Sequence, residues 1–124
     1  MAITTHVMQN GARNLVVKYH ISGEAADYAD QLLVDISALD STTTRLRVDR
    51  IEASLVGFAA FLDWDATTDT PLIALPEGED VFDFTDVGGI TSDAGAGATG
   101  DIFITTTGML TGDFGTIVLH MKKS

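Results

Sequence analysis

The stretch Asn14–Ser22 reads NLVVKYHIS, and it decides the fold class. Apolar side chains recur at every second position and share one side of the segment, namely Leu15, Val17, Tyr19 and Ile21. The positions between them carry a more polar set that includes Lys18 and His20. An alternation with a period of two is typical of a β-strand that buries one face. We therefore expect a strand here, packed on a core by its apolar side.

Short blocks of the same kind follow along the chain, separated by segments rich in Gly, Asp, Thr and Pro. Turn residues between alternating blocks are typical of antiparallel sheets. The further strand candidates lie at 31–37, 44–56, 58–65, 71–75, 81–84, 101–107 and 114–122. Eight strand candidates in 124 residues predict a single all-β domain spanning 1–124, an antiparallel β-sandwich of about eight strands and of jelly-roll or Greek-key type.

Three segments depart from simple alternation. In the block 44–56 the apolar parity changes near Asp49 and Arg50, which predicts a β-bulge at that point. Residues 1–12 precede the first clear strand, and we expect them to form an N-terminal arm. Residues 87–100 contain five glycines and no strand pattern, which predicts a long exposed loop.

The chain carries a net charge of −11, and the acidic residues are concentrated in one part of it. Twelve acidic residues and no Lys or Arg lie between Ile51 and Met121. Such a surface repels phosphate backbones and anionic lipid, so we expect neither nucleic acid nor membrane as a partner. The absence of Cys excludes disulfides and thiolate chemistry.

Targeting signals are not expected either. The first residues show neither the basic nor the apolar run of a secretion signal. The longest apolar run, 55–62, is far short of the roughly 20 residues that span a membrane.

The segment 95–100 (GAGATG) fits the spacing G-x-G-x-x-G of dinucleotide-binding loops. That loop works between a strand and a helix, because the free N–H groups of the helix hold the pyrophosphate. Here a polar segment precedes the motif and a strand candidate follows it. We therefore expect a glycine-rich loop and no cofactor.

Asp63, Asp65 and Asp69 place three carboxylates in a strand-to-turn segment and are candidate calcium ligands. The segment does not follow the EF-hand pattern, and the alternative is a solvated acidic turn that caps backbone N–H groups. With Glu77 and Glu79 these residues also invite a glycosidase interpretation. A glycosidase needs one carboxyl with a raised pKa in an apolar pocket, whereas these side chains lie in polar turns. We therefore expect surface carboxylates and no enzyme.

Three histidines, His6, His20 and His120, are candidates for a metal site or a general base. His20 and His120 lie on the more polar faces of the first clear strand and the last one, so they would meet if those strands pair. No Ser or Asp constellation accompanies them, and we expect partly exposed strand histidines.

Arg45, Arg47 and Arg50 form a localised basic cluster in an acidic chain. Arg45 and Arg47 share one face of an alternating strand, and arginine is suited to bidentate recognition of carboxylates at interfaces. We predict an interface here, extended by Lys122 and Lys123 if the last strand lies nearby. The alternative is ion pairing within the chain, with Asp35, Asp49 or Glu52.

Five segments in a fixed order carry a family resemblance. They are 14–20 (NLVVKYH), 46–54 (LRVDRIEAS), 63–69 (DWDATTD), 94–102 (AGAGATGDI) and 105–108 (TTTG), followed by a Gly-Asp hairpin and a strand with terminal lysines. Over about 14–123, this arrangement resembles the small virion structural proteins of tailed bacteriophages, especially those of marine and cyanobacterial hosts.

The resemblance implies a head decoration, or cement, protein that binds the outside of an icosahedral capsid, with no catalytic residue to carry over. We expect the major capsid protein as partner, a homotrimer as assembly, and the capsid exterior as location, reached after assembly in the host cytoplasm. One alternative is another virion part, such as a tail, collar or fibre-base domain. Another is a carbohydrate-binding module that stacks sugars on Trp64, Tyr19 or Tyr28.

Overall fold

The computed structural model describes residues 3–23, 27–39, 43, 45–91 and 97–123. Within these residues the chain is built of strands and two short 3-10 helices. The strands are β1 (Ile3–Asn10), β2 (Asn14–Ser22), β3 (Gln31–Val34), β4 (Leu46–Val56), β5 (Ala59–Trp64), β6 (Thr70–Leu75), β7 (Gly78–Asp83), β8 (Ile90–Thr91), β9 (Ile102–Thr107) and β10 (Phe114–Lys123). The helices are η1 (Ile36–Ala38) and η2 (Thr85–Val87). Neither is long or apolar enough to cross a membrane, and the described residues hold no other helix.

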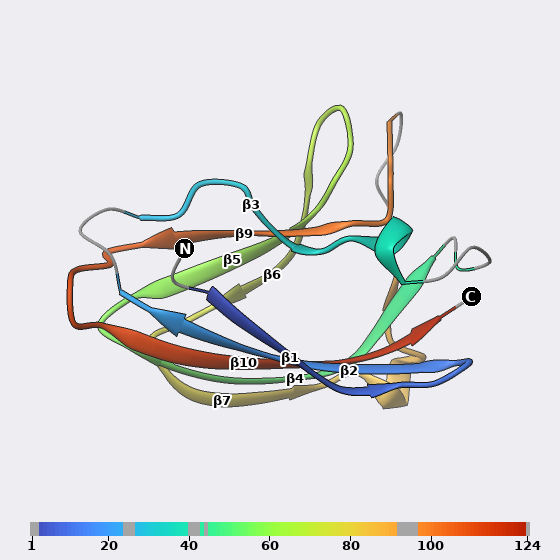
Figure 1. Ribbon diagram of the computed structural model, residues 1–124, viewed down its shortest axis with the longest axis horizontal. Coiled ribbons are helices and arrows are strands. Elements are labelled where there is room, and N and C mark those ends of the chain that lie inside the picture. Colours follow the sequence, from blue (N-terminus) through green and yellow to red (C-terminus); the bar gives the residue numbers. More distant parts are fainter. Residues whose placement is uncertain (1–2, 24–26, 40–42, 44, 92–96, 124) are drawn as a thin grey trace.

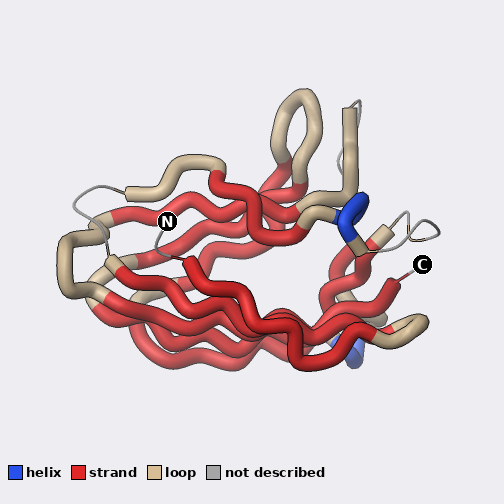
Figure 2. The backbone as a smooth tube through the Cα atoms, viewed as in Figure 1, coloured by secondary structure: helices blue, strands red, loops and turns tan. Residues whose placement is uncertain are grey.

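The strands form two antiparallel sheets that lie one over the other (Figures 1 and 2). One sheet has the order β1-β2-β10-β4-β7, with β8 paired to β4, and the other has the order β3-β9-β5-β6. Strands from the two halves of the chain pair throughout, β2 with β10, β3 with β9, β4 with β7 and β5 with β6. The chain therefore resembles one long hairpin rolled into a sandwich, which is a jelly roll. The predicted all-β sandwich is confirmed, and the jelly roll is the topology observed.

The core lies between the two sheets. Strand β2 has the predicted bounds, and its four alternating apolar side chains, Leu15, Val17, Tyr19 and Ile21, are buried. Trp64 of β5 is 1% exposed, as is Phe58, which precedes that strand. The period-two pattern of the sequence thus corresponds to the inward face of each long strand.

Strand β4 contains the predicted bulge. Arg50 lies opposite His120 of β10 while Val48 lies opposite Met121, so Asp49 is the extra residue. The bulge lets Val48 and Ile51 both point into the core, where each is 0% exposed. The carbonyl of Asp49 accepts a hydrogen bond from the backbone N–H of Phe84 at 2.8 Å, which ties the segment after β7 to the bulge.

Two predicted segments need correction. Residues 3–10 were expected in an N-terminal arm, but they form the edge strand β1, paired with β2 from Ile3 opposite Ile21 to Asn10 opposite Leu15. The segment 87–100 is not one long loop, because β8 pairs with β4 at Arg47 and Val48. Residues 92–96 of that segment lie outside the described residues, and 97–100 are irregular.

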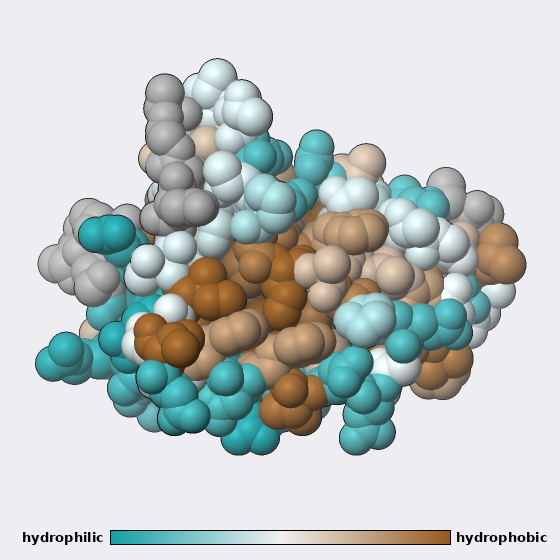
Figure 3. All heavy atoms as spheres, turned by 180° about the vertical axis from the view of Figure 1, so that it is seen from behind, coloured by the Kyte–Doolittle hydropathy of each residue, from teal (hydrophilic) through white to brown (hydrophobic). Residues whose placement is uncertain are grey.

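Strands β6 and β7 are edge strands, one in each sheet. Ile73 of β6 and Phe82 of β7 are partly buried and pack against the core. Figure 3, the view from behind, shows a band of hydrophobic residues across the middle of this face, with hydrophilic residues along its lower margin. The charged candidate site lies elsewhere, at one end of the sandwich.

Candidate functional site

A hollow of about 390 Å³ lies where β2 and β4 begin and β10 ends. This is the right-hand end of the molecule in Figure 1, where the C-terminus is marked. The hollow is lined by Arg13, Asn14, Arg45, Arg47, Thr91, Lys122 and Lys123. Five of the seven Lys and Arg residues of the chain thus surround one hollow in a protein of net charge −11.

The sheet register brings these residues together from distant parts of the sequence. Strand β10 lies between β2 and β4, so Lys122 is directly opposite Asn14 on one side and Arg47 on the other. The backbone N–H of Lys123 donates to the carbonyl of Arg13 at 2.7 Å, which holds the turn before β2 at the same end. The Nζ of Lys123 donates to Oδ1 of Asn10 at the end of β1.

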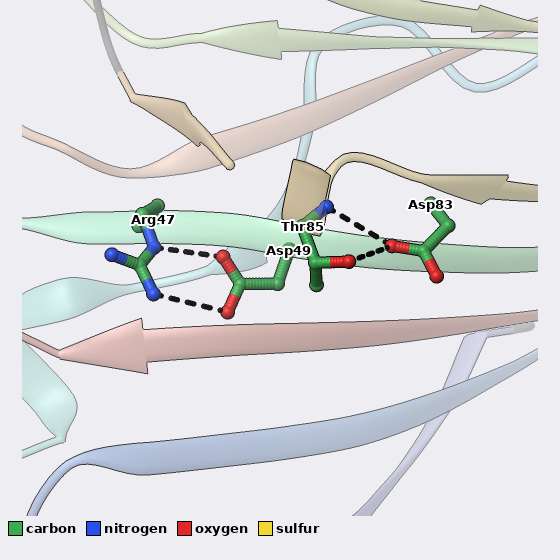
Figure 4. A network of polar contacts seen from close by, with 4 residues as sticks. All are labelled: Arg47, Asp49, Asp83 and Thr85. Carbon is green, nitrogen blue, oxygen red and sulfur yellow. Dashed lines mark hydrogen bonds and ion pairs between the residues drawn. The ribbon is translucent and has the colours of Figure 1, made fainter. Parts of the chain in front are cut away.

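Arg47 is held in place by Asp49, two residues further along the same strand (Figure 4). Its Nε donates to Oδ1 of Asp49 at 2.7 Å and its Nη2 donates to Oδ2 at 3.3 Å. The side chain of Asp49 is 10% exposed and that of Arg47 is 39% exposed, so the pair runs from the bulge outward to the hollow. The hydrogen bond to Asp49 raises the pKa of the Arg47 guanidinium further above its usual value, which keeps it charged.

The segment after β7 packs against this ion pair. Asp83 accepts hydrogen bonds from the backbone N–H of Thr85 at 3.0 Å and from its hydroxyl at 2.7 Å, and these bonds lower the pKa of Asp83 (Figure 4). Gly89 has a φ of +82°, and a Cβ on it would lie 2.5 Å from both Arg47 Cγ and Asp49 Oδ1. A residue without a side chain is therefore required beside the pair.

The structure brings together only some of the residues of the predicted interface. Arg45, Arg47, Lys122 and Lys123 come together as predicted, and Arg13, which sequence reasoning missed, joins them. Arg50 does not line the hollow. Its Nε lies 3.2 Å from Oε1 of Glu52, and Nε2 of His120 lies 3.6 Å from the same oxygen.

The alternative of internal ion pairing is therefore confirmed for two arginines, because Arg47 pairs with Asp49 and Arg50 with Glu52. Asp35 has another role, since its carboxylate accepts from the backbone N–H of Ser37 and caps η1. Arg13 was missed because its position at the hollow depends on the pairing of β2 with the lysine-bearing last strand, which leaves no local signal in the sequence.

The candidate calcium ligands do not converge. Asp65 accepts a hydrogen bond from the Thr99 hydroxyl at 2.8 Å, and Asp69 accepts from the backbone N–H of Ala66 at 3.1 Å. Partial burial, and then the charges of Asp69 and Asp30, raise the pKa of Asp63. Among the described residues, no three His, Asp or Glu side chains are placed to hold a metal ion.

The two glutamates of the glycosidase interpretation, Glu77 and Glu79, do not belong to a cluster of three acidic or histidine side chains among the described residues either. Glu77 accepts from the backbone N–H of Gly57 at 3.1 Å, which makes it part of a turn. Glu79 is exposed on the edge strand β7.

The histidines do not meet. Although β2 and β10 pair, His20 lies opposite Thr116, and His120 is four residues further along β10, opposite Val16. Four residues of strand correspond to roughly 13 Å. His6 lies on β1 opposite Lys18.

Two of the three aromatic residues of the sugar-stacking alternative are inside the protein. Trp64 and Tyr19 are each 1% exposed, so neither side chain offers a surface on which a sugar could stack. The hydroxyl of Tyr19 donates to the carbonyl of Leu33 at 3.2 Å, which spans the two sheets, and Tyr28 is partly buried against the core. In the glycine motif, residues 95 and 96 lie outside the described part, while 97–100 are irregular and lead into β9 instead of a helix.

No family model matches this chain, and no curated protein is similar to it. Among solved structures, the chain is similar to a cupin superfamily protein from Desulfitobacterium hafniense DCB-2. The match covers 98% of this chain and 76% of that chain, at 10% sequence identity and a TM-score of 0.37. A similarity this low carries no argument about function.

Proposed function

We propose that this chain is a non-enzymatic structural protein of a bacteriophage virion, and that it decorates the outside of an icosahedral head as a homotrimer. In this proposal the basic hollow is the surface that meets an acidic region of the major capsid protein. The family resemblance of the sequence supplies the class of protein. The charge distribution indicates which surface of the protein docks.

The observation that carries the proposal is the segregation of charge. Five basic side chains surround the hollow, whereas 51–121 holds twelve acidic residues and no Lys or Arg. A decoration protein makes many symmetric contacts on a shell, and complementary charge sets the register and the association rate of such contacts. Cations placed on the ends of paired strands are held by a rigid sheet, which suits a surface that docks repeatedly in one orientation.

The experiment uses heads of the phage that encodes this chain, prepared without the protein. Purified protein is added, the heads are sedimented, and the number of bound copies is measured by gel densitometry at several salt concentrations. We expect wild type to bind, Lys122→Glu to reduce occupancy, and the loss to be largest at low salt, because exposed charges are screened by ions.

Lys18→Glu is the matched control, because Lys18 is also an exposed lysine on a strand of the same sheet but does not line the hollow. Wild-type occupancy is expected for this variant. Binding to tails and not to heads would assign the chain to the tail, collar or fibre base instead. Undiminished occupancy by a variant that combines Arg45→Glu and Lys122→Glu would overturn the hollow as the docking surface.

A further inference from the structure

The basic hollow brings basic residues of neighbouring strands together. Lys122 is exposed and lies directly opposite Arg47 in the strand register, and Arg47 is paired with Asp49. Like charges in this arrangement destabilise a sheet. The chain has eighteen acidic residues, yet none of the described residues that line the hollow is acidic. Such a cluster is suited to binding an anion.

Arg47 is prepared to receive such an anion. Asp49 uses two of the five N–H donors of its guanidinium, which fixes the plane of the group while the rest of the side chain stays accessible. Asp49 is itself fixed, because it is buried at the bulge and its carbonyl binds the N–H of Phe84. A guanidinium that is already oriented loses less conformational freedom when it binds, and its planar donors match the two oxygens of a carboxylate.

The surroundings of the hollow decide which anion fits. A nucleic acid strand needs a basic track along many phosphates, whereas the acidic residues of this chain would repel such a strand beyond the hollow. A volume of about 390 Å³ accommodates a few side chains and not an extended polymer. Asn14 and Thr91, also in the lining, supply neutral groups that can bond the amides of a peptide backbone.

We infer that the hollow is a preorganised site for two or more neighbouring carboxylates of an acidic peptide segment, which Arg45, Arg47 and Lys122 bind together. The inference rests on the proposed function, and it deepens that function by naming the chemistry that the partner presents. Arg47 supplies a bidentate contact, and Lys122 and Arg45 supply charge on either side of it.

The probe is hexaglutamate with a blocked N-terminus and C-terminus, titrated into the purified protein by calorimetry and by amide NMR shifts. We expect shifts around Asn14, Thr91 and Lys122, and an affinity that falls with salt. Lys122→Glu is expected to weaken binding by about tenfold or more, because a charge-assisted contact becomes a repulsion. Arg47→Lys keeps the charge but loses the bidentate geometry, and it is also expected to bind more weakly than wild type.

Lys18→Glu changes the net charge by the same amount and should bind within about twofold of wild type. An equal loss in this variant would overturn the inference, because binding would then follow net charge and not the hollow. Inorganic phosphate is the second probe. If phosphate binds the hollow as tightly as hexaglutamate does, the site is a general oxyanion site and the peptide assignment is wrong.

The two proposals fail in different ways. If hexaglutamate binds the hollow but heads do not take up the protein, the peptide site stands and the virion function is wrong. If heads take up the wild type and not Lys122→Glu, while hexaglutamate fails to bind, the virion function stands and the peptide site is wrong. Thermal unfolding of each variant, measured in parallel, shows that a loss of binding is not a loss of fold.

Discussion

The two ends of the sandwich use charge in opposite ways. The left-hand end in Figure 1 is where the chain turns from β4 to β5 and from β9 to β10. Three acidic side chains accept hydrogen bonds from the backbones of these turns. Asp27 accepts from Met109 at 2.8 Å, Asp113 from Leu110 at 2.8 Å, and Glu77 from Gly57 at 3.1 Å. Gly57 lies so close to the Asp113 carboxylate that a Cβ there would collide with it, and its φ is +91°. Each of these three acids therefore accepts a hydrogen bond from the backbone of a turn.

At the other end the cations are gathered around one hollow. Of the five basic residues around the hollow, Arg47 has an ion pair with Asp49 and Lys123 has a hydrogen bond with Asn10, whereas Lys122 faces Arg47. A charge that satisfies a backbone group stabilises the fold, but a charge placed beside its own kind costs stability. The comparison predicts that substitutions at the two ends change stability with opposite signs.

A substitution in the core between the two ends should change the free energy of unfolding the most. Trp64→Ala removes a buried indole and leaves a cavity, so we expect the free energy of unfolding to fall by about 3 to 5 kcal/mol. Phe61→Ala is the control, because Phe61 lies on the outer face of the same strand and is 41% exposed. Urea unfolding followed by circular dichroism measures both. Equal, small effects would mean that Trp64 does not lie in the core.

Asp27→Ala tests the acidic end. The change removes the acceptor of the Met109 and Gly108 N–H groups and of the Thr106 hydroxyl, and both Met109 and Thr106 are buried. We expect a loss of about 1 to 3 kcal/mol, because buried donors are left without a partner. Asp80→Ala removes an exposed carboxylate of β7 and should change the melting temperature little. If Asp27→Ala leaves the free energy of unfolding unchanged, the acidic side chains at this end do not stabilise the fold, and the contrast between the two ends is wrong.

The fold was predicted from the sequence wherever a strand buries one face. The bounds of β2 and the bulge at Asp49 follow from the positions of apolar residues alone. Strand β1 was missed because its side chains are nearly all exposed, so it shows no apolar alternation. Strand β8 was missed because a strand of two residues is too short to show an alternation of apolar and polar side chains.

The sequence predicted the candidate site only on the condition that the last strand lies near the arginines. Arg45 and Arg47 could be paired by their spacing, but Lys122 joins them only because β10 lies between β2 and β4. That pairing is long-range and leaves no local signal. The ion pair of Arg47 with Asp49 depends on the geometry of the bulge, and the place of Arg13 depends on the β1–β2 turn. Sequence spacing could therefore name most of the cations but not their arrangement.

Asp63 is an acid outside both ends, and it tests whether an uncompensated charge costs stability. Its pKa is raised by partial burial, and then by Asp69 and Asp30, so the folded state disfavours the charged form. The penalty is fully present at neutral pH, and it disappears as the pH falls below the ordinary Asp value of about 3.9. Asp63→Asn should therefore raise stability at pH 7, by less than Asp27→Ala lowers it, and have no such effect at pH 3.

Asp86→Asn is the control for this pH series, because Asp86 is exposed on η2 and the change in net charge is the same. Melting temperatures of the two variants and the wild type between pH 3 and pH 7 provide the measurement. A stabilisation by Asp63→Asn that is equal at both ends of this range would show that the effect comes from packing and not from ionisation.

Lys122→Glu gives the smallest effect and the sharpest test of the basic end. The change replaces a repulsion across the strand pair by an attraction to Arg47, so we expect the isolated protein to become more stable by about 0.2 to 1 kcal/mol. Lys18→Glu has no such neighbour, because Lys18 lies opposite Val118 and His6. The gain should also shrink as salt is added, since both side chains are accessible to ions.

The sign of this change decides what the basic residues are for. A variant that folds more stably and yet binds hexaglutamate more weakly separates the two roles, because one substitution then improves the fold and damages the site. Differential scanning calorimetry at low and high salt resolves a shift of this size when both lysine variants are run beside the wild type. If Lys122→Glu instead loses stability as Asp27→Ala does, Lys122 is a structural residue, and the two ends of the sandwich use charge in the same way.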